Sequence, residues 1–287
     1  MNCLLVSDLH GKASSYRKLF ALLEKESPDI LFLGGDILPS WAGTAAASGG
    51  ISSSGFTVRK LADDFLDLKK QLGYKYPDIF VILGNDDGRA EEAAMFEATN
   101  EGVWKYIHNQ KIKYDKYDIY GYAFVPPSPF MLKDWERYDV SRYVDPGCIS
   151  PEEGIYTLPV SERKRRFSTI AKDLENLIEV DNIDNSIFLF HTPPYKTNLD
   201  RAALDGKTVD HAPVDIHVGS IAVRKMIEKH QPLITLHGHI HESARLTGSW
   251  SDKIGRTFCF SAAHDGPELA VVQFDPEQPD KATRELI

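Results

Sequence analysis

The stretch Leu-Ile-Thr-Leu-His-Gly-His-Ile-His, residues 233–241, joins a short apolar run to a Gly-His-x-His motif. The apolar run, residues 233–236, has the length and composition of a buried strand. Gly-His-x-His is rare by chance, since a shuffled chain with 20 Gly and 10 His contains about 0.02 copies. His239 and His241 are therefore candidate metal ligands at the end of a strand, and His237 is a candidate for orienting such a ligand.

Four other apolar runs end in the same way, with side chains that can bind a metal. These pairs are residues 4–7 with Asp8 and His10, residues 30–35 with Asp36, residues 79–84 with Asn85, and residues 187–190 with His191. Open α/β sheets carry their ligand sites at the carboxyl ends of the strands. The five runs together predict that seven side chains converge on one site.

The seven predicted ligands are carboxylates, imidazoles and one carboxamide, with no thiolate. This donor set suits Mn²⁺, Fe²⁺, Co²⁺, Ni²⁺ or Zn²⁺. Seven ligands are too many for one ion that keeps a position open, whereas two ions sharing one carboxylate, about 3.5–4 Å apart, accommodate them. Two ions would also neutralise the oxygen atoms of a phosphate ester, and a hydroxide bridging them could attack phosphorus in line.

Around these runs, short apolar segments alternate with longer amphipathic ones, which is the pattern of an α/β protein. Helices are predicted over residues 14–26, 56–72, 161–180 and 221–230, and further strands over residues 117–125, 257–261 and 269–274. We expect one domain over residues 1–287, with a loop-rich insertion near residues 126–160 that either covers a site or is a plain surface loop. The Ala-, Gly- and Ser-rich residues 42–55 are expected to form a disordered surface loop, with a mobile lid as the alternative.

The composition disfavours several classes of protein. With 42% hydrophobic and 26% charged residues, the chain of 287 residues is typical of globular proteins and unlike disordered ones. A net charge of -9 disfavours binding to nucleic acids or membrane surfaces, which both require a basic face. Three widely spaced cysteines, the absence of a signal-peptide pattern and the lack of any apolar stretch of about 18 residues predict a soluble, cytoplasmic protein.

The order Asp-x-His, Gly-Asp, Gly-Asn, His and Gly-His-x-His, from Asp8 to His241, resembles the calcineurin-like metallophosphoesterase superfamily. The resemblance implies a fold of two stacked mixed β-sheets flanked by helices, in four layers (αββα). It also implies two divalent metal ions and assigns their ligands. The first ion would be held by Asp8, His10, Asp36 and His241, and the second by Asp36 as a bridge together with Asn85, His191 and His239. The sequence around His191 and His239 is similar to that of the phosphodiesterase-like branch of this superfamily.

One position departs from the family pattern. The third motif is commonly Gly-Asn-His, and its histidine stabilises the transition state or protonates the leaving oxygen, whereas this chain has Asp86 there and Asp87 next. Two neighbouring cations favour the ionised form of an aspartate. Asp86 would then be a poor general acid and would repel a dianionic monoester more than a monoanionic diester. We therefore predict a phosphodiesterase of small phosphate esters with stabilised leaving groups. Its candidate catalytic residues are Asp36, Asn85, Asp86 and His191.

Other functions stay open. A non-catalytic protein-interaction scaffold of the same fold is kept open by Asp86, although every metal position is filled. Within the enzyme class a phosphomonoesterase or a nuclease is the alternative, and the net charge argues against the nuclease. Five basic residues could clamp a phosphate: Arg89, Lys133, Arg137, Lys196 and Arg201. The sequence leaves open the physiological substrate, the native metals and the oligomeric state.

Overall fold

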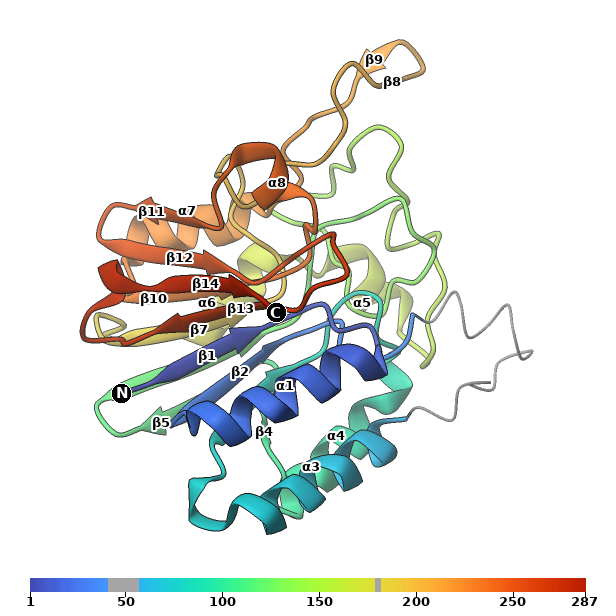
Figure 1. The fold of residues 1–287 in the computed structure, drawn as a ribbon. Coiled ribbons are helices and arrows are strands. Elements are labelled where there is room, and N and C mark those ends of the chain that lie inside the picture. The colour runs from blue at the N-terminus through green and yellow to red at the C-terminus, as the bar shows by residue number, and fades with distance from the viewer. Residues whose placement is uncertain (41–56, 179–181) are drawn as a thin grey trace.

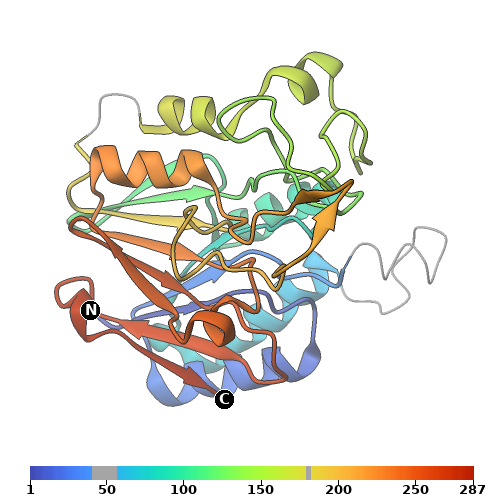
Figure 2. The ribbon, with the colours of Figure 1, turned by 90° about the horizontal axis from the view of Figure 1, so that it is seen from above.

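The computed structural model describes residues 1–40, 57–178 and 182–287 of the chain. Two six-stranded mixed sheets pack face to face, and helices cover their outer faces (Figure 1, Figure 2). This arrangement confirms the predicted α/β fold with two stacked mixed sheets flanked by helices. The loop predicted over residues 42–55 lies outside the described residues.

The first sheet has four parallel strands and an antiparallel pair at one edge, in the order β14-β13-β1-β2-β3-β4. Its strands are β1 (Cys3–Val6), β2 (Ile30–Gly34), β3 (Asp78–Ile82), β4 (Lys105–Tyr106), β13 (Ala270–Phe274) and β14 (Thr283–Leu286). Every residue of β1 and β2 is buried. Their continuous apolar runs are explained by this burial, because a parallel strand covered on both faces has no polar side.

The second sheet also has four parallel strands, but here one antiparallel strand lies at each edge, in the order β11-β12-β10-β7-β6-β5. Its strands are β5 (Gln110–Tyr114), β6 (Tyr117–Tyr122), β7 (Ser186–Phe190), β10 (Ile234–His237), β11 (Ser251–Ile254) and β12 (Thr257–Ser261). Tyr120 and Phe188 stack with ring centroids 4.4 Å apart, which fixes the register of neighbouring strands. A small separate hairpin joins β8 (Thr208–Val209) and β9 (Ala212–Pro213).

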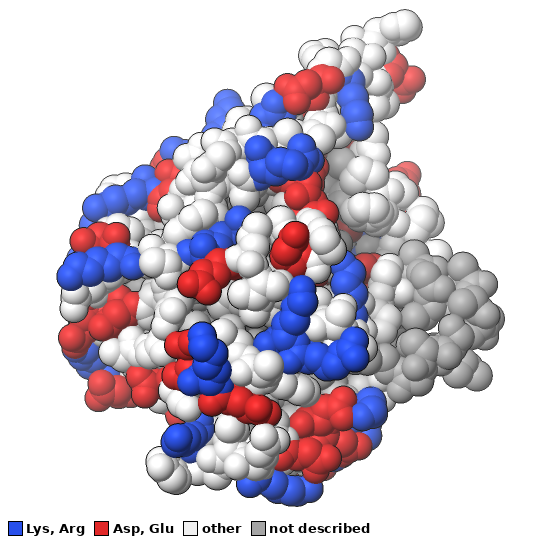
Figure 3. Space-filling model, in the orientation of Figure 1, with Lys and Arg blue, Asp and Glu red and all other residues white. Residues whose placement is uncertain are grey.

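Helices close both outer faces of the sandwich (Figure 2). The first sheet is covered by α1 (Ala13–Glu26), α3 (Val58–Leu72) and α4 (Glu92–Asn100), and the second by α6 (Ile170–Ile178) and α7 (Ile221–His230). The short helices α5 (Glu162–Phe167) and α8 (Ser243–Thr247) lie among the loops. In the part of the chain described, no helix is both long and apolar enough to cross a membrane. On the face shown in Figure 3, acidic and basic side chains are interspersed, without a continuous basic surface.

The single helix predicted over residues 161–180 is wrong, because the chain breaks into α5 and α6. Ser168 is extended, with φ -79° and ψ 136°. The hydroxyl of Thr169 accepts the backbone N–H of Lys172 at 3.2 Å, and the N–H of Ile170 donates to the carbonyl of Tyr138 at 2.8 Å. Ser and Thr favour such caps, so the local hydrogen bonds end one helix and start the next.

Residues 126–160 fold without regular helices or strands beyond isolated bridges, and buried polar contacts hold them in place. Lys133 and Glu136 form an ion pair in which both side chains are fully buried. Glu136 also accepts the backbone N–H of Ser128 at 2.8 Å. Trp135 is fully buried beside the ring of His108 at 4.8 Å between centroids. The segment is therefore tied to the body of the protein at defined points.

His108 makes the stability of this packing depend on pH. Its Nδ1 accepts the N–H of Ala123 at 3.1 Å, and burial together with the charge of Arg137 holds the pKa of His108 well below its ordinary value. As the pH falls below about 6.5, His108 binds a proton in the unfolded chain but stays neutral in the folded protein. The free energy of unfolding therefore decreases. We expect this group to lower the free energy of unfolding by up to about 2 kcal/mol between pH 8 and pH 5.

His108→Asn keeps a hydrogen-bond acceptor but cannot take up that proton. Urea unfolding of both proteins at pH 8 and pH 5 is expected to show a smaller loss of stability in the variant. An equal loss in the two proteins would contradict this role of His108.

Candidate metal centre

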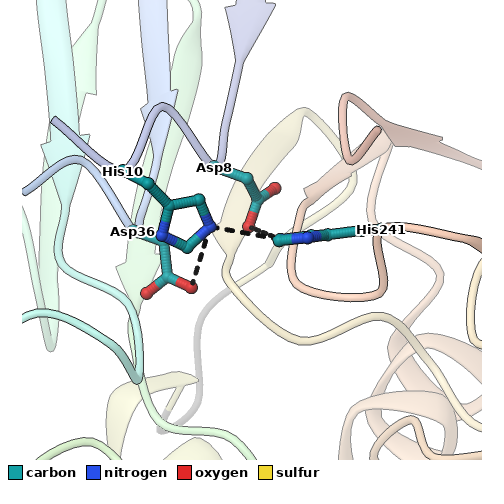
Figure 4. A group of neighbouring side chains, drawn as sticks. All are labelled: Asp8, His10, Asp36 and His241. Carbon is teal, nitrogen blue, oxygen red and sulfur yellow. Dashed lines mark hydrogen bonds and ion pairs between the residues drawn. The ribbon is translucent and has the colours of Figure 1, made fainter. Parts of the chain in front are cut away.

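Four predicted ligands meet where β1, β2 and β10 end. Asp8, His10, Asp36 and His241 each offer one donor atom, and these atoms all lie within 4.8 Å of one another. Figure 4 shows the four side chains pointing toward one point from loops of both sheets. The Nε2 atom of His241 lies 3.3 Å from Oδ1 of Asp8 and 3.3 Å from Nε2 of His10. The arrangement places two carboxylates and two imidazoles in the geometry of a metal site.

The other predicted ligands gather on the far side of Asp36. Oδ2 of Asp36 lies 4.0 Å from Nε2 of His10 and 3.3 Å from Nε2 of His191. Nε2 of His191 is in turn 3.1 Å from Oδ1 of Asn85, and the ring of His239 lies 5.0 Å from that of His191 between centroids. The structure thus brings all seven side chains together, with Asp36 between the two groups.

Hydrogen bonds orient His191 and hold the loop that carries it. Nδ1 of His191 lies 2.7 Å from the carbonyl oxygen of Gly34, so this nitrogen carries the proton and Nε2 faces the centre. His237 is fully buried, and its Nδ1 lies 2.9 Å from the carbonyl of Thr192, next to His191. His237 therefore holds the loop that carries His191 and does not face the centre.

The loops that carry the site have an unusual backbone. Asp8, His10, Asp36 and His239 have φ values of 59°, 46°, 50° and 74°, in the left-handed region that non-glycine residues rarely adopt. The N–H of Asp8 donates to the carbonyl of Gly35 at 3.0 Å, and the N–H of His10 donates to that of Asp36 at 2.8 Å. Such conformations cost about 1–3 kcal/mol each and cluster at functional sites.

Glycines beside the ligands leave room for their side chains. A Cβ atom on Gly84 would lie 2.3 Å from Oδ1 of Asp36, and one on Gly238 would lie 1.9 Å from Oγ of Ser7 and 2.8 Å from Oδ2 of Asp8. Only glycine fits at such distances. The glycines of the Gly-Asn and Gly-His motifs are therefore required by space next to the ligands.

The charges of the site compensate one another through protons on the histidines. Burial opposes charge on His191, but the carboxylate of Asp36 outweighs it and raises the pKa of His191 to about 9. Burial likewise opposes charge on His10, yet Asp86, Asp36 and Asp8 raise its pKa to about 9. Against the effect of burial, His241 lowers the pKa of Asp8 with help from His191 and His10, and His191 and His10 lower the pKa of Asp36. The carboxylates of the centre therefore favour positive charge beside them.

The donor set fits divalent metal ions. The side chains of Asp8 and Asp36 are only 2% and 4% exposed, and their ion-pair partners among the described residues are all histidines. Buried carboxylates are costly without a cation, and neither has a lysine or arginine partner there. Imidazole, carboxylate and carboxamide donors suit ions of intermediate hardness.

Two neighbouring aspartates have different surroundings. Asp86 lines the cavity beside the centre, where Oδ2 lies 3.3 Å from Nδ1 of His10 and Oδ1 accepts the hydroxyl of Ser40 at 2.9 Å. Asp87 is fully buried and accepts the N–H groups of Leu38 and Gly84, both at 2.8 Å. Asp87 therefore joins the loops after β2 and β3 and is not available to a substrate.

The expectation that basic side chains clamp a phosphate is not supported at the five positions chosen. None of them lines the cavity beside the centre. Lys133 is buried against Glu136, Arg137 pairs with Asp173, and Arg89 pairs with Glu92. Lys207 is the one lysine or arginine among the described residues that line this cavity.

Comparisons with known proteins agree with this fold. A family model described as calcineurin-like phosphoesterase matches residues 1–243. An uncharacterised protein of Methanocaldococcus jannaschii is 41% identical over 80 residues, which cover 27% of this chain. The match spans about a third (31%) of that relative's length.

Two crystal structures align over nearly the whole chain. One, from Thermus thermophilus, has a TM-score of 0.57 and 18% identity, covering 99% of this chain and 98% of its own. Another has a TM-score of 0.61 and 17% identity with the same coverage. At these identities the likeness concerns the fold alone.

Proposed function

This chain belongs to the calcineurin-like phosphoesterase family, and from that premise we propose that it is a phosphodiesterase that depends on two divalent metal ions. The observation that carries the proposal is the compact group of Asp8, His10, Asp36 and His241, with donor atoms within 4.8 Å of one another. The catalytic form of the family is favoured over a binding scaffold because all seven ligand positions hold side chains able to coordinate a metal.

The ligands divide into two sets around Asp36. Asp8, His10 and His241 would hold the first ion, and Asn85, His191 and His239 the second. Support for Asp36 as the shared ligand comes from its position, with Oδ2 4.0 Å from His10 on one side and 3.3 Å from His191 on the other. When bound, such a pair of ions activates water at neutral pH and neutralises the oxygen atoms of a phosphate ester.

The protein itself would position the ester and limit its charge. With one lysine among the described lining residues and Asp86 beside the centre, a second negative charge on the phosphate is unfavourable. A diester carries one negative charge and a monoester up to two, so the geometry favours the diester. The Asp86 carboxylate is held in place by Ser40 and His10 and stays close to where the phosphate would bind.

The proposal is tested by hydrolysis of bis(p-nitrophenyl) phosphate by chelator-treated protein, with and without added Mn²⁺. Turnover that appears with the metal supports a metal-dependent phosphodiesterase. Turnover that is the same without metal excludes the proposed mechanism. The cytoplasmic location and the single-domain organisation stay predictions.

Asp86→His is expected to shift the preference toward monoesters. Replacing the anion by an imidazole removes the repulsion of a second phosphate charge and supplies a proton donor. We expect the ratio of kcat/KM for p-nitrophenyl phosphate to that for bis(p-nitrophenyl) phosphate to rise roughly tenfold, equivalent to about 1.4 kcal/mol. Asp86→Asn, which removes the charge without adding an imidazole, separates the two effects. Wild-type turnover of the monoester far above that of the diester would refute the preference.

A further inference from the structure

A large cavity opens directly onto the metal centre. Its volume is about 1080 Å³, at the upper end of what small-molecule sites enclose. His10, Asp36, Asn85, His239 and His241 lie at one end. The rest is walled by two segments distant in sequence, residues 126–148 and residues 202–221 around the β8–β9 hairpin, which lie beside each other in Figure 2. An ester bound at the centre would have room for one of its organic groups between these walls.

The walls are apolar and partly open to solvent. Leu132 and Ile240 are buried in the lining, at 5% and 7% exposure. Phe130, Met131, Val140 and Tyr143 also line the cavity, yet they are 63%, 45%, 38% and 67% exposed. Apolar side chains gathered at the mouth of a cavity indicate a ligand with an apolar group.

The charges of the lining argue against a second anionic group. Lys207 is the single lysine or arginine among the described lining residues, whereas Asp145, Asp215 and Glu242 also belong to the lining. A diphosphate or a nucleotide with several phosphates would meet these carboxylates with little positive charge beyond the metal centre. The organic group that fits therefore carries no negative charge.

The apolar wall is held in shape by contacts behind it. The carboxylate of Asp139 accepts the N–H of Ile221 and the hydroxyl of Ser220, both at 2.6 Å, which ties the segment to the start of α7. The buried Lys133–Glu136 pair and the buried Trp135 also hold this segment. A wall fixed in this way presents a preformed surface, so binding costs less conformational entropy.

We propose that the cavity binds an alkyl chain and that the substrate is a phosphodiester in which one ester group is a single hydrocarbon chain. This inference rests on the proposed function. Hydrolysis would add the oxygen of water to phosphorus and break the P–O bond to the other ester group. The departing oxygen takes a proton, and an alkyl phosphate remains.

The test is a series of p-nitrophenyl alkyl phosphates with methyl, butyl, hexyl and octyl chains, used below their critical micelle concentrations with saturating Mn²⁺. Burial of each added methylene is expected to raise kcat/KM roughly threefold until the cavity is full. If the methyl ester is hydrolysed but kcat/KM stays constant or falls as the alkyl chain lengthens, the alkyl site is overturned and the proposed phosphodiesterase activity still stands. If no diester of the series is hydrolysed, the proposed function fails, and the binding experiment below then decides on the cavity.

Matched variants connect the chain-length effect to the cavity. Phe130→Ser and Tyr143→Ser are expected to reduce the ratio of octyl to methyl ester kcat/KM at least threefold. Tyr74→Ser, at an aromatic residue 95% exposed and outside the lining, is expected to leave the ratio unchanged. An unchanged ratio in all three variants would contradict the assignment.

Cys148 gives a readout that does not need turnover. It lines the cavity and is partly exposed, whereas Cys3 and Cys259 are fully buried. With Mn²⁺ present, octylphosphonate is expected to slow alkylation of Cys148, and methylphosphonate at the same concentration is not. Equal labelling with both phosphonates would overturn the proposal.

The substrate with its alkyl chain could reach the cavity from solution or from a bilayer. Turnover of an alkylphosphocholine dispersed below its critical micelle concentration would support the proposal with solution as the source. Turnover only when the same lipid is held in phosphatidylcholine vesicles would support it with the bilayer as the source.

Discussion

Asp36→Asn is expected to lower kcat/KM for bis(p-nitrophenyl) phosphate by at least about 10³-fold, equivalent to about 4 kcal/mol. Asp36 lies between the two groups of candidate ligands, and its carboxylate is the negative charge that both groups share. Asparagine has nearly the same shape and can still accept the N–H of Asp86, which is 2.8 Å from Oδ1 of Asp36. The loss should therefore come from weaker metal binding with the fold retained, as measured by activity, bound Mn²⁺ and thermal unfolding.

The control for this variant is the same substitution at an exposed site. Asp67 is 76% exposed on α3 and pairs only with Lys70 among the contacts described, so Asp67→Asn should leave activity within about twofold. An Asp36→Asn protein that keeps activity within tenfold of the wild type would show that Asp36 is not a shared metal ligand.

Gly84→Ala is expected to reduce kcat/KM for bis(p-nitrophenyl) phosphate at least 10²-fold, equivalent to about 2.7 kcal/mol, because the added methyl group collides with the ligands. Its Cβ would lie 2.3 Å from Oδ1 of Asp36 and 2.7 Å from Nε2 of His191. The Cβ would also lie 2.5 Å from the backbone nitrogen of Asp36, so the ligands must move. We expect weaker Mn²⁺ binding in a protein that still unfolds cooperatively.

Gly73→Ala is the matched control, at a glycine outside the cavity lining. Nothing lies within 4 Å of a Cβ there, although its φ of +57° makes alanine unfavourable by about 1 kcal/mol. This variant should lose some stability and keep its activity. Full activity and unchanged Mn²⁺ affinity in Gly84→Ala would contradict the close packing around Asp36.

Much of the fold and the convergence of the site could be predicted because buried parallel strands leave a clear signal. Residues 30–35 and 79–84 are apolar without alternation, and their first polar side chains lie at the carboxyl end of the sheet. The topology then brings Asp36 and Asn85 together without further information. Edge strands lack this signal. Charged residues alternate with other residues along β5, and they interrupt β14.

The cavity could not be predicted in the same way. Its wall, residues 126–148, depends on single contacts such as the Lys133–Glu136 pair and the cap that Asp139 gives to α7. Such contacts have no period along the chain. The same reason explains why Lys133 was expected to bind phosphate: the sequence shows its charge and not its buried partner. Asp87, with three backbone N–H donors, is a similar case.

The most direct test of the central claim is a titration of chelator-treated protein with Mn²⁺, in which bound metal per chain and hydrolysis of bis(p-nitrophenyl) phosphate are measured on the same samples. A centre with seven ligands around a shared Asp36 predicts two ions per chain, with full activity only when both are bound. Folded protein that binds no divalent ion, or that hydrolyses the diester equally well without one, would contradict it.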